Sequence, residues 1–275
     1  MTLVALAEVG RGVVPVDAPV LHADDEGVLR GRSVFETLRV YGGAPFKLDA
    51  HLDRLAASAE RLHLPPPPRD EFVAATRAAV AAAPEADAVL RLLWLAGREE
   101  GDSTGLVLVS TLPDDLDAKR ERGLRLTVLP WSPGALGGVK STSYAANMLA
   151  QDEARRAGAD DALLVSPDGT VLEAPTSNVW FREGERLLTP SLDLPILAGV
   201  TRATLLELAP GVGYAVEEGS YELDRLRGAD EAFLTASIRE VMPVVAVDGV
   251  AIERGPAAAA LQTALRGAAG YPAVR

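Results

Sequence analysis

The sequence predicts a mixed α/β protein of two domains, and three observations support this fold class. The chain has 275 residues, a length that suits one large domain or two modest ones. Short apolar runs with the composition of buried strands alternate with amphipathic or alanine-rich segments that are typical of helices. A polar and highly charged run at 113–122 (PDDLDAKRER) separates two such regions. We therefore expect one domain over 1–112, a linker over 113–122 and a second domain over 123–275.

The first region begins with short strands and turns over 12–47. Its clearest strand is Val34–Tyr41 (VFETLRVY), which contains β-branched and aromatic residues and precedes the hairpin signal Gly42-Gly43. A helix capped by Asp49 should follow, because one face of it would be apolar, formed by Leu52, Leu55, Ala56, Ala59 and Leu62. After a stop at Pro65–Pro68, we expect a second helix over 70–83 and buried strands over 88–96 and 106–112.

The second region repeats this mixture of helices and strands. The turn Pro167-Asp168-Gly169 lies between two apolar segments and predicts a hairpin, and Asp248-Gly249 marks another turn. Pro243 stands between two of the expected strands. The expected helices cover 144–157, a short segment from about 201, and 256–266, and the expected strands cover 162–165, 171–172, 178–181, 187–189, 231–236 and 244–247.

Composition excludes several classes of function. The net charge is −12, and no basic stripe is available to neutralise the phosphates of a nucleic acid or an anionic membrane. The chain has no cysteine, and its three histidines lie in unrelated contexts, so we expect neither disulfides nor a metal site. No apolar run reaches the roughly 20 residues of a membrane span, and the N-terminus does not resemble a signal peptide. We therefore expect a cytoplasmic enzyme with a small-molecule substrate.

One of the three lysines is placed for covalent chemistry. Arginine supplies nearly all the positive charge of this chain, whereas only a desolvated lysine amine can lose its proton and attack a carbonyl. Lys119 lies in a charged cluster, and Lys47 precedes a helix start, so both should be at the surface. Lys140 follows an apolar, glycine-rich run in LGGVKSTSYAANM, where a half-exposed lysine without a special role is the alternative.

If Lys140 forms a Schiff base with pyridoxal 5'-phosphate, three further kinds of group are needed. An acid must keep the pyridine nitrogen protonated, and Glu173 in TVLEAPTSNVWF is either that acid or a surface turn residue. Phosphate donors are available at the helix start Val200-Thr201 and at Ser237, although Thr201 could instead be an ordinary N-cap. Arg54 in HLDRL could neutralise the phosphate or be a solvated helix residue.

Five segments in one order then resemble a known family. They are VFETLRVYGG with HLDRL, VKSTSYAANMLAQDEARRAGADDALL, VLEAPTSNVWF, ILAGVTR and DEAFLTASIREVMPVVAVDG, and the resemblance extends from Leu21 to Gly249. The chain is similar to the fold-type IV pyridoxal-phosphate enzymes, also called class IV aminotransferases. This family comprises branched-chain aminotransferases, D-amino-acid aminotransferases and 4-amino-4-deoxychorismate lyases.

The resemblance implies a fold and a role for each candidate residue. The fold is a small α/β domain, a short linker and a larger pseudo-barrel domain that binds pyridoxal phosphate, and members form homodimers or larger assemblies. Lys140 is implied as the catalytic Schiff-base lysine and Glu173 as the partner of the pyridine nitrogen. The remaining implied cofactor-binding residues are Arg54, Val200, Thr201 and Ser237 at the phosphate, Tyr144 near the ring oxygen, and Asn178 as a support of the pocket.

The choice within the family stays between two activities. The run from Leu21 to Gly43, with Glu36-Thr37 in VFETLR, looks most like the lyases that form 4-aminobenzoate and pyruvate in folate synthesis. The alternative is an aminotransferase acting on branched-chain or D-amino acids or other amines, and a third hypothesis is a binding protein without turnover. The sequence departs from the family at Gly31-Arg32-Ser33 and at Ala174-Pro175. One of three arginines should bind a substrate carboxylate, and the candidates are Arg39, Arg91 and Arg98.

Overall fold

The computed structural model describes residues 1–99 and 101–271, which form two compact units. The first unit contains Met1–Asp114 and Val139–Tyr144, and the second contains Asp115–Gly138 and the chain from Ala145 onward. The charged run at 113–122, which we expected as a linker, contains helix α4 (Leu116–Arg122) of the second unit. Its charges favour a helix because they pair one turn apart, with Lys119 2.6 Å from Asp115 and Arg120 2.6 Å from Asp117.

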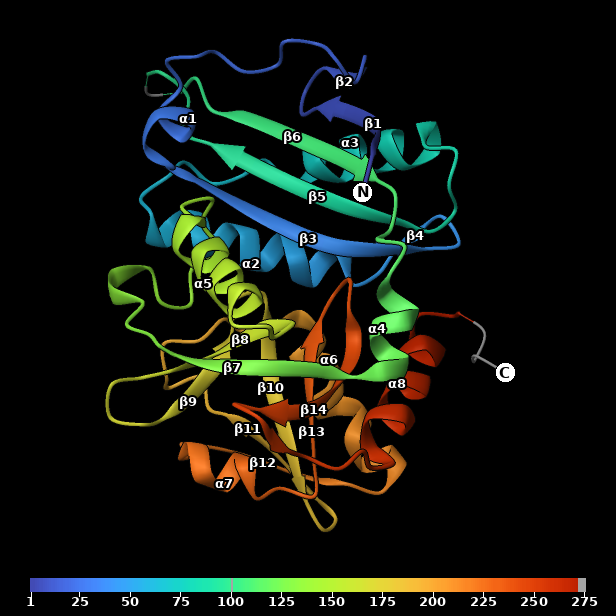
Figure 1. The fold of residues 1–275 in the computed structure, drawn as a ribbon. Coiled ribbons are helices and arrows are strands. Elements are labelled where there is room, and N and C mark those ends of the chain that lie inside the picture. The colour runs from blue at the N-terminus through green and yellow to red at the C-terminus, as the bar shows by residue number, and fades with distance from the viewer. Residues whose placement is uncertain (100, 272–275) are drawn as a thin grey trace. The chain divides into compact units, whose positions relative to one another are not determined.

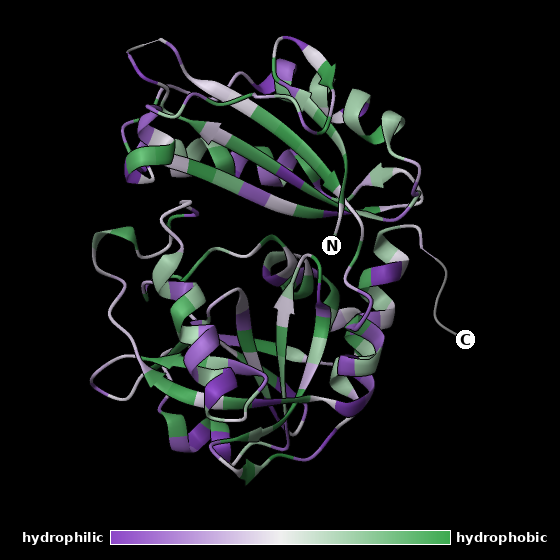
Figure 2. Ribbon diagram, turned by 45° about the horizontal axis from the view of Figure 1, so that its top comes forward, coloured by the Kyte–Doolittle hydropathy of each residue, from purple (hydrophilic) through white to green (hydrophobic). Residues whose placement is uncertain are grey.

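The first unit is built on a six-stranded antiparallel sheet in the order β2-β1-β6-β5-β3-β4 (Figure 1). The short helix α1 (Glu26–Arg30) precedes β3. Hydrophobic colour dominates the long strands of this sheet, whereas its helices alternate between hydrophobic and hydrophilic colour (Figure 2). The strands are β1 (Leu3–Glu8), β2 (Gly12–Val14), β3 (Ser33–Tyr41), β4 (Ala44–Pro45), β5 (Ala88–Leu95) and β6 (Thr104–Ser110).

Helices α2 (Leu48–Arg61) and α3 (Arg69–Ala82) cover one face of this sheet, where α2 packs on β3 and α3 packs on β1, β2 and β6. The expected cap by Asp49 is wrong, because α2 starts at Leu48 after Lys47, and Asp49 pairs with Arg69 from the first turn. The apolar stripe is also rotated from the expected one. Ala56 is exposed, and the polar residues His51 and Ser58 are buried beside Leu52, Leu55 and Ala59.

The second unit contains a nine-stranded sheet that closes on itself. Strand β9 pairs with both β8 and β10, so the path β10-β13-β14-β7-β8-β9 returns to its start. This barrel-like sheet confirms the mixed α/β fold with a pseudo-barrel. Its strands are β7 (Leu124–Pro130), β8 (Asp161–Val165), β9 (Val171–Ala174), β10 (Ser177–Glu183), β11 (Arg186–Pro190), β12 (Ala215–Gly219), β13 (Glu231–Ala236), β14 (Glu240–Val247) and β15 (Val250–Ala251).

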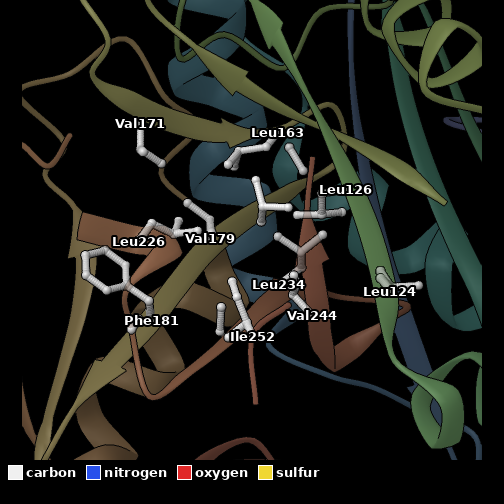
Figure 3. Packing of buried hydrophobic residues seen from close by; sticks show 14 of the residues in the cluster. Leu124, Leu126, Leu163, Val171, Val179, Phe181, Leu226, Leu234, Val244 and Ile252 are labelled. Carbon is white, nitrogen blue, oxygen red and sulfur yellow. The ribbon is translucent and has the colours of Figure 1, made fainter. Parts of the chain in front are cut away.

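Apolar side chains fill the inside of the closed sheet. Figure 3 shows Leu126, Leu163, Val179, Leu234 and Val244 pointing toward one another from five different strands. Burying such side chains stabilises the fold by roughly 1.5–3 kcal/mol each. The helices of this unit are α4, α5 (Ala145–Arg156), α6 (Val200–Leu208), α7 (Leu223–Arg227) and α8 (Ala257–Ala268), with 3-10 turns at Gly134–Leu136 and Ala209–Val212.

Pro243 does not separate two strands, as we had expected, but lies inside β14 opposite Phe233. The pairing of β14 with β7 begins only at Val244. Pro243 has no N–H to donate, but on the side of β14 that faces β7 no ladder hydrogen bond is formed at this residue. The strand therefore tolerates the proline.

Within residues 1–99 and 101–271, no helix is both long and apolar enough to cross a membrane. The same residues contain no group of three or more histidine, aspartate or glutamate side chains arranged to hold a metal ion.

Candidate active site

The backbone of Lys140 is fixed in the first unit by β3 and α2. The Phe35 N–H donates to the Lys140 carbonyl at 2.9 Å, and the Thr142 N–H donates to the Ser33 carbonyl at 3.0 Å. The Lys140 N–H in turn donates to Ser58 Oγ of α2 at 3.3 Å. Ser141 thus forms an isolated antiparallel bridge with Val34 of β3, and the hydrogen bonds around it set the position from which the Lys140 side chain starts.

The amine of Lys140 lies against two aromatic rings. Its Nζ is 4.6 Å from the centroid of the Phe35 ring and 5.7 Å from that of Tyr144. The two rings contact each other edge to face, with centroids 5.3 Å apart. Ring faces attract an ammonium group, and they also shield the amine from water on that side. The structure therefore brings together two of the predicted cofactor residues, Lys140 and Tyr144, with Phe35 as a third member that sequence reasoning missed.

A buried carboxylate holds Arg54, the predicted phosphate ligand. Glu36 of β3 is fully buried and accepts hydrogen bonds from Arg54 Nε at 2.7 Å and Nη2 at 2.6 Å. His51 Nδ1 lies 2.7 Å from the same carboxylate. The solvated alternative for Arg54 is therefore wrong, because its side chain is only 13% exposed.

The surroundings of this cluster lower the pKa values of Glu36 and His51. Burial by itself raises the pKa of Glu36, but the charge and hydrogen bonds of Arg54, with the His51 bond, outweigh it and lower the pKa to about 2. Burial is the main cause that lowers the pKa of His51, and the Arg54 and Lys140 charges add to it against the opposing effect of Glu36. His51 is therefore neutral at pH 7 and donates from Nδ1 to an ionised Glu36.

The cluster had a signal in the sequence that we did not use. Glu36 alternates with Val34 and Leu38, which face the helices, so it occupies a core-facing position where an unpaired charge would be costly. His51 and Arg54 are three residues apart on α2 and share one side of the helix. A buried glutamate on a strand thus predicts a cationic partner on the helix that covers it.

Glu173 and Asn178 form a second cluster, in the second unit. They lie opposite each other on β9 and β10, and Asn178 Nδ2 donates to Glu173 Oε2 at 3.1 Å. The Leu197 N–H donates to the Glu173 carboxylate at 3.2 Å, and Asn178 Nδ2 also reaches the Leu197 carbonyl at 2.9 Å. The half-buried Glu173 is therefore not a loose turn residue, since two neighbours orient its carboxylate.

The start of α6 presents backbone donors directly after this cluster. Gly199 is the N-cap of the helix, and Val200 and Thr201 are its first two residues, both buried. The alternative of Thr201 as the N-cap is therefore wrong. A Cβ at Gly199 would lie 2.0 Å from Asn178 Oδ1, so a glycine is required for this close approach. The N–H groups of a helix start suit an anion.

Ser237 lies in the turn that joins β13 to β14, half-buried.

The three arginine candidates for the substrate separate into two groups. Arg39 and Arg91 share one face of the β3–β5 pair, because Arg91 lies opposite Thr37 and Arg39 is two residues further along β3. Arg98 lies beyond the end of β5 and forms an exposed ion pair with Asp102 at 3.1 Å.

Residues 33–247 match the family model described as amino-transferase class IV. The chain therefore belongs to the class IV aminotransferases, a family of enzymes that use pyridoxal 5'-phosphate, and the resemblance seen in the sequence is confirmed.

Two relatives and one solved structure illustrate the similarity. A bifunctional aminodeoxychorismate lyase / D-amino acid transaminase of Mycobacterium tuberculosis is 36% identical over 87% of this chain and 90% of that protein. An aminodeoxychorismate lyase of Bacillus subtilis is 34% identical over 92% of this chain and 90% of its own. The PLP-bound form of a hypothetical aminotransferase from Mycobacterium tuberculosis superposes with a TM-score of 0.90 at 32% identity, covering 96% of this chain and 98% of that one.

Proposed function

We propose that this enzyme is a 4-amino-4-deoxychorismate lyase that produces 4-aminobenzoate and pyruvate in folate synthesis. The observation that supports this proposal most directly is the similarity of nearly the whole chain to two proteins named as aminodeoxychorismate lyases. The transaminase activity in the name of one of them supports the alternative, an aminotransferase acting on D-amino acids, branched-chain amino acids or other amines.

The donor groups of this chain fit pyridoxal phosphate. Lys140 offers an amine for the aldehyde, and Glu173 a carboxylate for the pyridine nitrogen. When bound, the cofactor supplies an electron-withdrawing ring that stabilises negative charge on the amino-bearing carbon of the substrate. The phosphate-holding residues are Arg54, Val200, Thr201 and Ser237, with Tyr144 at the ring oxygen and Asn178 supporting Glu173.

Lys140 Nζ takes the proton from the amino-bearing carbon of the substrate. The rings of Phe35 and Tyr144 limit the directions from which water reaches this nitrogen, which keeps the proton available for transfer within the site. In the lyase reaction the ether C–O bond then breaks, the ring becomes aromatic, and the departing enolpyruvate takes up a proton to form pyruvate.

Glu173 keeps its carboxylate in one orientation through Asn178 and the Leu197 N–H. An oriented carboxylate holds a proton on a pyridine nitrogen more effectively than a mobile one, because no ordering is needed on binding. Asn178 therefore acts through Glu173 and does not itself contact the reacting atoms.

The carboxylates of the substrate are assigned to the face of the β3–β5 pair that contains Arg39 and Arg91. Phe35, which contacts the Lys140 amine, points to this same face, because it is two residues from Thr37 on β3. A planar guanidinium binds a carboxylate through two parallel hydrogen bonds. Arg98, in its pair with Asp102, is the less suitable candidate. We also propose a cytoplasmic homodimer, without a nucleic-acid or membrane partner, in keeping with the charge of −12.

A fluorescence assay for 4-aminobenzoate tests the proposal. Purified protein loaded with pyridoxal phosphate should convert 4-amino-4-deoxychorismate into equal amounts of 4-aminobenzoate and pyruvate. Lys140→Ala should abolish both products and the yellow colour, whereas Lys119→Ala, which changes an ion-paired residue of α4, should retain them. A yellow protein that forms neither product but transfers an amino group from an amino acid to a 2-oxo acid would establish the alternative.

A further inference from the structure

The turn between β13 and β14 contains a glutamate in a backbone conformation that normally belongs to glycine. The three residues Ser237, Ile238 and Arg239 connect Ala236 to Glu240, which face each other in the ladder. Glu240 has φ +58°. Hairpin connections commonly end at a residue in this left-handed conformation, which strains any residue other than glycine.

Burial distinguishes Glu240 from the other residues in this conformation. Across the described parts of the chain, the non-glycine residues with positive φ are Lys47, His63, Asp248 and Glu240. The first three are exposed, whereas Glu240 is fully buried. Both the strain and the burial of a charge act against stability at this position, so the carboxylate must make interactions that offset them.

The Glu240 carboxylate accepts hydrogen bonds from two helices. Gln262 Nε2 of α8 lies at 2.7 Å, and Arg266 of the same helix donates from Nη2 at 2.8 Å and from Nε at 3.1 Å. Arg120 Nη2 of α4 is the third partner, at 3.0 Å. Two guanidinium groups around one buried carboxylate fix its position more tightly than a neutral hydrogen bond would.

The same side chains also hold the backbone of the turn. Arg120 Nη2 donates to the Arg239 carbonyl at 3.1 Å, and Gln262 Oε1 accepts from the Val241 N–H at 2.9 Å. The side chain of Arg239 itself pairs with Asp161 of β8. The chain directly after Ser237 is therefore anchored at consecutive residues to α4, α8 and β8.

We propose that Glu240 is a positioning residue that fixes the Ser237 turn for a phosphate monoester, the phosphate of the cofactor. This inference depends on the proposed role of Ser237. A glycine at this position would form the same turn without strain but would lack the carboxylate to which Arg120, Gln262 and Arg266 donate. Glu240 adopts the strained conformation but joins the turn to two helices. The hydroxyl and N–H donors of the turn are therefore ordered before the phosphate binds, and binding does not have to order them.

The test compares pyridoxal phosphate with pyridoxal, which lacks the phosphate, in titrations of the cofactor-free protein. The dissociation constant of pyridoxal divided by that of pyridoxal phosphate measures the contribution of the phosphate to binding. Glu240→Gly relieves the backbone strain and should fold, yet it should reduce this ratio by about tenfold, the loss typical when a residue that orients a metal ligand is removed. The ³¹P NMR signal of the bound cofactor should broaden or shift, which a purely structural role would not cause.

Two further variants serve as controls. Asp248→Gly changes the positive-φ residue at the other end of β14 and should leave the ratio unchanged. Glu240→Gln keeps the volume and the strain but removes the charge, and it should also reduce the ratio, so the test does not depend on the folding of the glycine variant.

The possible results separate the inference from the assignment on which it depends. A wild-type ratio and ³¹P signal in both Glu240 variants would overturn the inference. If Ser237→Ala lowers the ratio while the Glu240 variants do not, only the role of Glu240 fails. If none of the Ser237 and Glu240 variants changes the ratio, both the inference and the assignment of the Ser237 hydroxyl to the phosphate fail.

Discussion

Replacing Glu36 with glutamine should lower the free energy of unfolding by about 3 kcal/mol at pH 7. The reason is the buried ion pair with Arg54, which holds the pKa of Glu36 at about 2 instead of its ordinary value of 4.5. Each pKa unit corresponds to about 1.4 kcal/mol, so the gap between 4.5 and about 2 gives roughly 3 kcal/mol. A second estimate agrees, because removing one partner of a buried ion pair typically lowers the free energy of unfolding by about 3–5 kcal/mol.

The effect should depend on pH in a defined direction. Because the pKa of Glu36 is lower in the folded state than in the unfolded state, the stabilisation is fully present above about pH 4.5 and is lost as the pH falls toward 2. By pH 3 the difference between wild type and Glu36→Gln should have fallen to about two fifths of its value at pH 7.

Urea unfolding followed by tryptophan fluorescence measures this difference. Trp94 is buried against Phe72 in the same unit as Glu36 and reports on the unfolding of that unit. Asp53→Asn is the matched control, because it also removes one carboxylate paired with an arginine, Arg69, but at the surface. Its cost should be no more than about 1 kcal/mol. A Glu36→Gln variant as stable as this control, or a difference that is equal at pH 7 and pH 3, would refute the reasoning.

Three other changes have expected outcomes. Glu173→Gln should retain the cofactor but slow the exchange of the substrate α-proton for deuterium, and an unchanged exchange rate would remove Glu173 from its role. Gly199→Ala should weaken cofactor binding in an absorbance titration, because its Cβ would displace Asn178, 2.0 Å away. Gly97→Ala should lower the melting temperature, since Gly97 has φ +81° and its Cβ would lie 2.1 Å from the Asp102 carbonyl oxygen; an unchanged melting curve would contradict this.

Local patterns in the sequence predicted most of the elements that surround the candidate site. The apolar spacing from Leu52 to Leu62 predicted a helix, and α2 covers nearly the same residues, although its buried stripe is rotated. The apolar runs at 178–181 and 231–236 likewise correspond to β10 and β13. Such predictions succeed where burial of one face dominates, because the period of the apolar residues then follows the geometry of the element.

Contacts between distant parts of the chain could not be predicted in this way. The bridge that positions Lys140 joins Ser141 to Val34 of β3, more than a hundred residues earlier in the chain. The charged run at 113–122 resembled a linker, because its ion pairs form only once the helix exists. Glu240 gave no signal at all, since its conformation depends on side chains from two helices that the sequence does not place beside it.

Glu36 and Glu240 share a feature that bears on how this chain recognises phosphate. Each is a fully buried carboxylate paired with arginine, and each directly holds a group that we assign to the cofactor phosphate, Arg54 in one case and the Ser237 turn in the other. Buried ion pairs are often no more stabilising than well-packed apolar residues of similar volume. Their benefit to this protein is then better explained by the fixed position of the donors than by stability. Replacing Glu240, Arg120 and Arg266 together by apolar residues should therefore leave the fold stable but weaken the binding of pyridoxal phosphate far more than the binding of pyridoxal.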